Sequence, residues 1–149
     1  MIKNQKFGVE IELTGISRLV AANTIAKFFN TTREKIGGTY DTHNIVDNQG
    51  RTWQVMRDSS ITAEPSSDIY KVEIVTPILT YEDIAPLQEI LRALRKKGAK
   101  ANSSCGIHIH VDGANHNANS LKNIINFMTS RQDLVYEALA IKSNIVISE

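Results

Sequence analysis

Three segments of the sequence place acidic or imidazole side chains at alternate positions. Glu10 and Glu12 stand two residues apart, Glu73 lies in a short apolar run, and His108 and His110 again stand two residues apart. Successive side chains of a β-strand point to opposite faces, so each pair falls on one face of its strand. If the three segments are strands of one sheet, three glutamates and two histidines share one surface.

Such a surface would differ from an ordinary solvent-facing one, where opposite charges are mixed because neighbouring like charges are unfavourable. Crowded carboxylates repel one another unless a cation or a proton relieves the repulsion. Carboxylate oxygens suit Mg²⁺ and Mn²⁺, and an added imidazole tolerates Mn²⁺ or Zn²⁺. Each motif alone is typical of an exposed strand. Together they predict divalent-metal ligands at Glu10, Glu12, Glu73 and His108.

Other polar or reactive residues are interpreted more simply. Asp58 follows a predicted strand beside the expected cleft, where it either contacts substrate or metal or caps a turn. Cys105 is interpreted as a packed small residue and not as a nucleophile. We expect His43 and His116 at the surface or in loops, and Trp53 in the core.

The elements that must position these residues alternate between strand and helix. Strict alternation of apolar and polar residues predicts that one side of a strand is exposed to solvent, which is typical of an antiparallel or mixed sheet. We therefore expect an α+β domain whose helices pack on one face of the sheet and whose other face is open. The expected strands are residues 6–14, 39–46, 52–57, 70–76 and 105–111. The expected helices begin at Ser17, Asp83 and Ser120 and end near residues 30, 97 and 139.

Length and composition fit one globular domain, residues 1–149, with 42% hydrophobic and 22% charged residues. The net charge of +1 and the 6% of aromatic residues predict neither a nucleic-acid partner nor a membrane partner. A single cysteine allows no internal disulfide and favours a reducing, cytoplasmic location. We see neither a signal-peptide pattern nor an apolar run of the roughly 20 residues that span a bilayer. The sequence also lacks the glycine-rich motifs of P-loop and Rossmann nucleotide sites, so a nucleotide would need metal ions and scattered basic side chains.

Four segments, in order, resemble the amidoligase family of the carboxylate–amine ligase superfamily, which includes glutamine synthetase and the glutamate–cysteine ligases. Residues 7–13 resemble its opening Gly-x-Glu-x-Glu strand, and residues 72–77 are similar to the strand that supplies a further metal-binding glutamate. Residues 105–112 resemble its Gly-x-His-x-His strand. Residues 53–61 are similar to a segment ending in Asp-x-Ser-Ile, which makes Asp58 a candidate catalytic residue.

The resemblance implies a glutamine-synthetase-like sheet whose concave open face holds ATP and two or three Mg²⁺ or Mn²⁺ ions. By analogy Glu10 and His108 would share one metal, and Glu12 and Glu73 another. His110 would be catalytic and would lie near the phosphates or the acyl phosphate. The implied reaction transfers the γ-phosphoryl group of ATP to a carboxylate and then forms an amide with an amine. Amino acids or short peptides would supply both groups.

In one respect the sequence departs from this family. A later strand normally supplies a further glutamate and arginines that contact the phosphates, and we see no such strand before Glu149. We therefore expect the N-terminal part of a catalytic domain, inactive when isolated, with an exposed sheet edge through which copies could pair. The alternative is a shortened, non-catalytic module for metal binding or assembly. A third hypothesis, a His-x-His metal enzyme of cupin type, ranks last because the usual following glutamate is absent.

Overall fold

A computed structural model describes residues 2–140, which divide into two compact units, one ending at Asp112 and one beginning at Gly113. The first unit contains a six-stranded sheet, two α-helices and three single-turn 3₁₀ helices at Ile2–Asn4, Asp68–Tyr70 and Tyr81–Asp83. The second unit contains one helix, α3 (Ala118–Ala138). None of the helices within residues 2–140 has the length and apolarity that crossing a membrane requires.

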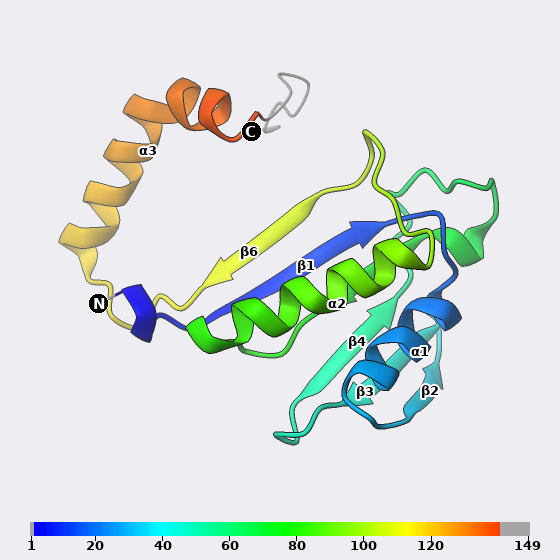
Figure 1. Ribbon diagram of the computed structural model, residues 1–149. Helices are drawn as coiled ribbons and strands as arrows, with labels where there is room; N and C mark the ends of the chain where they lie inside the picture. Colours follow the sequence, from blue (N-terminus) through cyan, green and yellow to red (C-terminus); the bar gives the residue numbers. More distant parts are fainter. Residues whose placement is uncertain (1, 141–149) are drawn as a thin grey trace. The chain divides into compact units, whose positions relative to one another are not determined.

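The sheet runs in the order β2-β3-β4-β5-β1-β6, and every neighbouring pair is antiparallel. Strand β1 therefore lies between β5 and β6 although the three are far apart in sequence (Figure 1). This confirms an α+β fold built on an antiparallel sheet. The strands are β1 (Phe7–Leu13), β2 (Arg33–Gly37), β3 (Thr42–Val46), β4 (Thr52–Met56), β5 (Val72–Val75) and β6 (Ile107–Val111).

Two helices cover one face of the sheet in the first unit, α1 (Arg18–Phe28) and α2 (Ile84–Lys96) (Figure 1). Ser17 caps α1 by accepting a hydrogen bond from the Val20 amide, as its residue type predicts. Alternate residues of the strands form the core between sheet and helices, and Trp53 is fully buried in it. The core also contains Val9, Ile11, Leu13, Ala21, Ile25, Ile45, Val55, Val72, Ile74, Ile90 and Leu94.

Strand β2 is absent from the sequence-based prediction, which placed a turn at Gly37 and began an extended segment only at residue 39. The strand carries charged residues and leaves Ile36 54% exposed, so it has no apolar–polar alternation to detect. Charged side chains are a common protection of sheet edges. Its partner β3 buries His43, which is 3% exposed, so the expectation of a surface histidine is wrong. Burial and the nearby Arg33 lower the pKa of His43, which therefore packs as a neutral ring.

Two elements have apolar residues whose spacing predicts a face toward the core, namely Ile107, Ile109 and Val111 on β6 and one stripe of α3, and both differ from this expectation. Ile107, Ile109 and Val111 lie on the helix-bearing face of β6, opposite Ile11, Val9 and Phe7, but their side chains are 58–65% exposed. No helix of the first unit covers this edge strand. In the second unit α3 begins at Ala118, two residues before the predicted start at Ser120. Asn117 is its N-cap, and Ser120, the third residue of the helix, forms a capping box with Asn117. The spacing of its apolar residues predicts an inward face, but all members of that face are exposed except the half-buried Val135: Leu121, Ile124, Ile125, Met128, Leu134 and Leu139.

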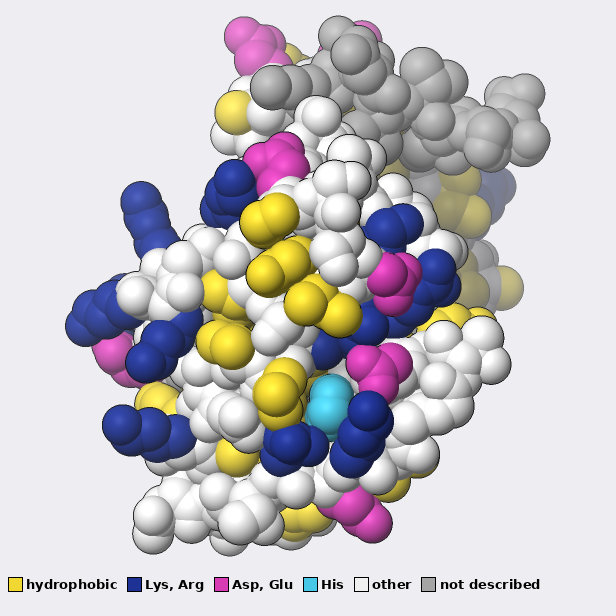
Figure 2. Space-filling model, turned by 90° about the vertical axis from the view of Figure 1, so that its right-hand side faces the viewer, with side chains coloured by type: hydrophobic (Ala, Val, Ile, Leu, Met, Phe, Trp, Pro, Cys, Tyr) yellow, Lys and Arg dark blue, Asp and Glu magenta, His cyan; other side chains and the backbone are white. Residues whose placement is uncertain are grey.

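A polar network joins the β3–β4 turn to the start of α2. Arg51 donates two hydrogen bonds to Asp83, both of 2.9 Å, and one of 2.8 Å to Asp47. The Trp53 indole donates to the same Asp47 carboxylate at 3.2 Å. The Arg51 hydrogen bonds lower the pKa of Asp83 to about 2. Elsewhere, too, basic side chains lie next to acidic ones, as the face in Figure 2 shows.

We predict that the Asp83→Asn variant loses about 2 kcal/mol of unfolding free energy at pH 7, because ionised Asp83 is stabilised by Arg51 in the folded state. Asp83 has a lower pKa folded than unfolded, so its contribution is complete above about pH 4 and disappears as the pH falls toward 2. Urea unfolding at pH 7 and pH 2.5 should show the two proteins converging at the lower pH. Glu89→Gln is the control, since Glu89 forms a surface pair with Arg92, and it should change little. Equal stability of Asp83→Asn and wild type at pH 7 would contradict the prediction.

Candidate metal centre

The register of β1 with its two neighbours gathers the predicted site residues on the sheet face opposite the helices. Glu12 pairs with Glu73 of β5, and Glu10 pairs with His108 of β6. Directly paired residues of an antiparallel sheet point to the same side. All four predicted metal ligands thus share one face. His110 lies there too, opposite Gly8.

One group on this face consists of three carboxylates. Glu12, Asp58 and Glu73 each place an oxygen within 4.8 Å of the others. Asp58 reaches the group from the loop that follows β4, whose last residue Met56 pairs with Glu73. Glu12 is 8% exposed, and the other two carboxylates are half-buried. The arrangement suits a hard divalent cation such as Mg²⁺ or Mn²⁺, which prefers oxygen ligands.

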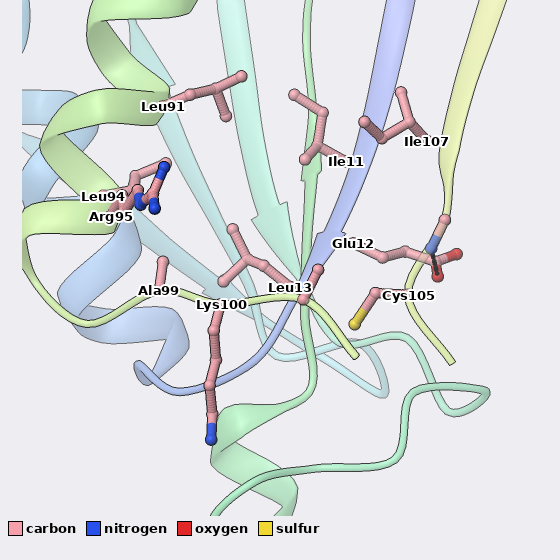
Figure 3. A pocket seen from close by; sticks show the side chains of 12 residues that line it. Ile11, Glu12, Leu13, Leu91, Leu94, Arg95, Ala99, Lys100, Cys105 and Ile107 are labelled. Carbon is pink, nitrogen blue, oxygen red and sulfur yellow. Dashed lines mark hydrogen bonds between the residues drawn. The ribbon is translucent and has the colours of Figure 1, made fainter. Parts of the chain in front are cut away.

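Backbone contacts hold Glu12 in this position. The Gly106 amide donates a 2.7 Å hydrogen bond to the Glu12 carboxylate, and the Glu12 amide donates to the Gly106 carbonyl at 3.1 Å. The bond to the carboxylate is drawn in Figure 3, at the end of a cavity of about 480 Å³. Leu91 and Leu94 of α2 form part of the apolar wall of this cavity. The cavity lies on the helix side, and of the three carboxylates only Glu12 lines it.

The second group on the open face is Glu10 with two imidazoles. His108 Nδ1 lies 2.9 Å from Glu10 Oε2, and His110 Nε2 lies 3.2 Å from Glu10 Oε1. The hydrogen bond between His108 and Glu10 lowers the pKa of the glutamate and raises the pKa of the histidine. Each partner therefore favours the charged form of the other. A metal ion held by this carboxylate and this imidazole would have to displace the proton of His108, because only neutral imidazole is a ligand.

The pKa values of Glu73 and Asp58 are shifted in opposite directions. Burial raises the pKa of Glu73, and the charges of Asp58, Glu10 and Glu12 raise it further. Burial would also raise the pKa of Asp58, but hydrogen bonds from the Ser60 amide and hydroxyl, of 2.7 and 2.8 Å, outweigh it. Asp58 thus has a lowered pKa and stays ionised. Within residues 2–140, none of the ion pairs joins a Lys or Arg to Glu12, Asp58 or Glu73.

The sequence indicated that Asp58 either caps a turn or belongs to the candidate site. In the structure its carboxylate accepts hydrogen bonds from Ser60 and also lies within 4.8 Å of Glu12 and Glu73. Its capping of Ser60 directs the carboxylate toward Glu12 and Glu73. Missing from the sequence analysis was the Gly106 amide that orients Glu12, because no side-chain pattern reveals a backbone donor. Cys105 is half-buried, with its sulfur 3.6 Å from Asn102 Oδ1, and lies outside both groups. The catalytic and metal-binding roles of these residues stay predictions.

The model of a family described as "Putative amidoligase enzyme" matches residues 3–147. No curated protein and no solved structure shows a significant match to the chain. The matched region contains every residue of the two groups on the open face.

We predict that Glu73→Gln raises the melting temperature by about 1–4 °C at pH 7 in EDTA, because it removes a repelled charge. Glu73 has a raised pKa in the folded state, so its ionisation destabilises the fold progressively as the pH rises above about 4.5. The difference between variant and wild type should therefore be small at pH 4 and larger at pH 7. Thermal unfolding followed by circular dichroism measures it.

The control for this prediction is Glu34→Gln, the same chemical change at an exposed position of β2. It should leave the melting temperature within about 1 °C of wild type. A clear loss of stability in Glu73→Gln would assign Glu73 a structural role and contradict the repulsion described above.

Proposed function

The chain belongs to the amidoligase family, a family of ligase-type enzymes, and we propose that it forms amide bonds from a carboxylate and an amine at the expense of ATP. The observation that carries the proposal is the cluster of Glu12, Asp58 and Glu73, which has no Lys or Arg partner within residues 2–140 and lies beside Glu10 and His108. Phosphoryl transfer without a glycine-rich phosphate loop requires metal ions to neutralise the phosphates. A sheet face rich in carboxylates is suited to hold them.

The donor chemistry fits two ions of the Mg²⁺ or Mn²⁺ type. Glu12, Asp58 and Glu73 would hold one through oxygen ligands, and Glu10 with His108 would hold another through mixed ligands. Such ions, when bound, supply positive charge to the phosphate oxygens of ATP. The resemblance grouped Glu12 with Glu73 and Glu10 with His108, and cross-strand pairing supports the same grouping.

The reaction proceeds in two transfers between the substrates. A carboxylate oxygen of the acyl substrate attacks the γ-phosphorus of ATP, the bond to the β–γ bridging oxygen breaks, and ADP leaves. The nitrogen of the amine then attacks the acyl carbon, inorganic phosphate leaves and the nitrogen loses a proton. His110 is 65% exposed at its side chain and bound to Glu10, so its ring can contact a phosphate oxygen or take up that proton.

The six strands of residues 2–112 offer few cations to a transferred phosphoryl group, since their basic residues are Arg33 and Lys35 and Lys35 is paired with Asp41. Arg33 is the only arginine in the six strands of residues 2–112, and it contacts Asn23 and His43 on the helix-bearing side. Arg57, which follows β4, is paired with Asp68. The 149-residue chain alone is therefore expected to bind metal with little or no turnover, because removing one preorganised donor already costs about 10²–10³ in rate.

Mn²⁺ binding to the 149-residue chain, measured by calorimetry, tests the metal site separately from turnover. We expect a Glu12→Gln/Asp58→Asn double variant to bind Mn²⁺ at least tenfold more weakly than wild type, because it loses two oxygen ligands. Glu34→Gln on β2 should bind as the wild type does. Equal affinity of the double variant and wild type would rule out the cluster as the metal site.

Amide formation is tested with the natural protein, including any residues that follow Glu149 in it. With Mg²⁺, ATP and a panel of amino acids and short peptides, we expect phosphate release that depends on both substrates, with an equimolar amide detected by mass spectrometry. Glu12→Gln should lower the rate at least about 10²-fold. Metal binding without any amine-dependent phosphate release would favour the non-catalytic module.

A further inference from the structure

Gly8 occupies an unusual position in strand β1, which lies between β5 and the edge strand β6. It lies on the open face, opposite His110 and two residues before Glu10. Its backbone is not in the left-handed region, and a Cβ added there would meet no atom within 4 Å. Neither conformation nor packing thus requires glycine, although glycine weakens a strand. A glycine in such a place often marks the close approach of a ligand.

The strand beside Gly8 is irregular at the same point. A continuous ladder from the Glu10–Val75 pair would place Phe7 opposite Ile78, but Phe7 is bridged to Leu79 by hydrogen bonds of 3.1 and 2.7 Å. One extra residue is therefore accommodated after β5, opposite Gly8. Such bulges redirect side chains and are over-represented next to active sites. Here Leu79 is fully buried whereas Ile78 is 68% exposed.

Gly8, which has no side chain, and the bulge after β5 both border a groove of about 440 Å³. This volume lies within the range that small-molecule sites occupy. The groove is continuous with the candidate metal centre, because it shares Glu10 and His110 with it. Its lining includes Gly8, Glu10, Val75, Pro77, Ile78 and His110.

We propose that this Gly8 groove binds the aliphatic or aromatic substituent of one substrate, whose polar reacting end lies at Glu10 and His110. The inference rests on the proposed ligase function and names the class of substrate it acts on. Val75, Pro77 and Ile78 supply the apolar contacts, and Gly8 leaves the space that the substituent fills. The molecule is either the amine or the carboxylate, because both must reach the same centre.

Binding of simple probes to the isotopically labelled chain tests the proposal without turnover. The amine arm compares n-hexylamine with methylamine, and the carboxylate arm compares hexanoate with acetate in the presence of Mg²⁺. In one arm we expect the six-carbon probe to bind about tenfold or more tightly than the short one, since each buried methylene adds up to roughly fourfold. The same probe should shift the amide resonances of Gly8 and Ile78. The arm that shows the preference identifies the substrate concerned.

Gly8→Val fills the groove and should abolish the chain-length preference. Open space around Gly8 and the high strand propensity of valine predict an unchanged or raised melting temperature, so loss of binding would not reflect unfolding. Ile78→Ser should weaken the preference at least threefold. Its matched control is Ile36→Ser, which alters an exposed isoleucine of β2 outside the groove and should keep the preference.

Absence of a chain-length preference in both arms would overturn the proposal, and so would an unchanged preference in Gly8→Val. These results are separable from those on the ligase function. A protein that prefers the longer probe but never releases phosphate refutes the ligase and leaves a binding groove. Amide synthesis without the chain-length preference refutes only the groove.

Discussion

The antiparallel register of β1 with β5 and β6 is the constraint on which the rest of the site depends. It places Glu12 beside Glu73 and Glu10 beside His108. A slip of one residue in β1 would turn both glutamates toward the helices and Val9, Ile11 and Leu13 toward solvent. Burial of those three apolar side chains therefore fixes the register and, with it, the positions of the glutamates.

Two groups of carboxylates in this protein differ in whether basic side chains neutralise them. Asp47 and Asp83 receive direct hydrogen bonds from Arg51, and the resulting network ties a hairpin turn to a helix. Glu12 and Glu73 are paired with no Lys or Arg among residues 2–140, and burial together with the charges of Asp58, Glu10 and Glu12 raises the pKa of Glu73. Unrelieved repulsion of this kind is costly for a fold, so its presence on the open face is a physical argument for a function there. The same reasoning applies to Gly8. Glycine has a low strand propensity, and neither the backbone conformation nor the packing at this position requires it.

The irregular segments complete the site that the strands begin. The turn at residues 58–60 directs Asp58 into the carboxylate group, and Gly106, at the entrance to β6, donates its amide to Glu12. A bulge after β5 exposes Ile78 beside Glu10 and borders the groove. Regular strands thus set which face is polar, whereas loops and bulges set how the side chains converge and where a substrate can lie.

The sequence by itself determined which residues share the open face, because side chains alternate with a period of two wherever apolar residues mark the buried side. From this alone Glu10, Glu12, Glu73 and His108 could be grouped, and Trp53 could be placed in the core. Strand order, the charged edge strand β2 and the burial of His43 were decided only by the tertiary structure. These features depend on pairings between distant segments, which leave no local periodicity. The tertiary structure likewise decided that Asp58 joins Glu12 and Glu73, since a loop residue reaches its partners by the path of the chain through space and not by any repeat in the sequence.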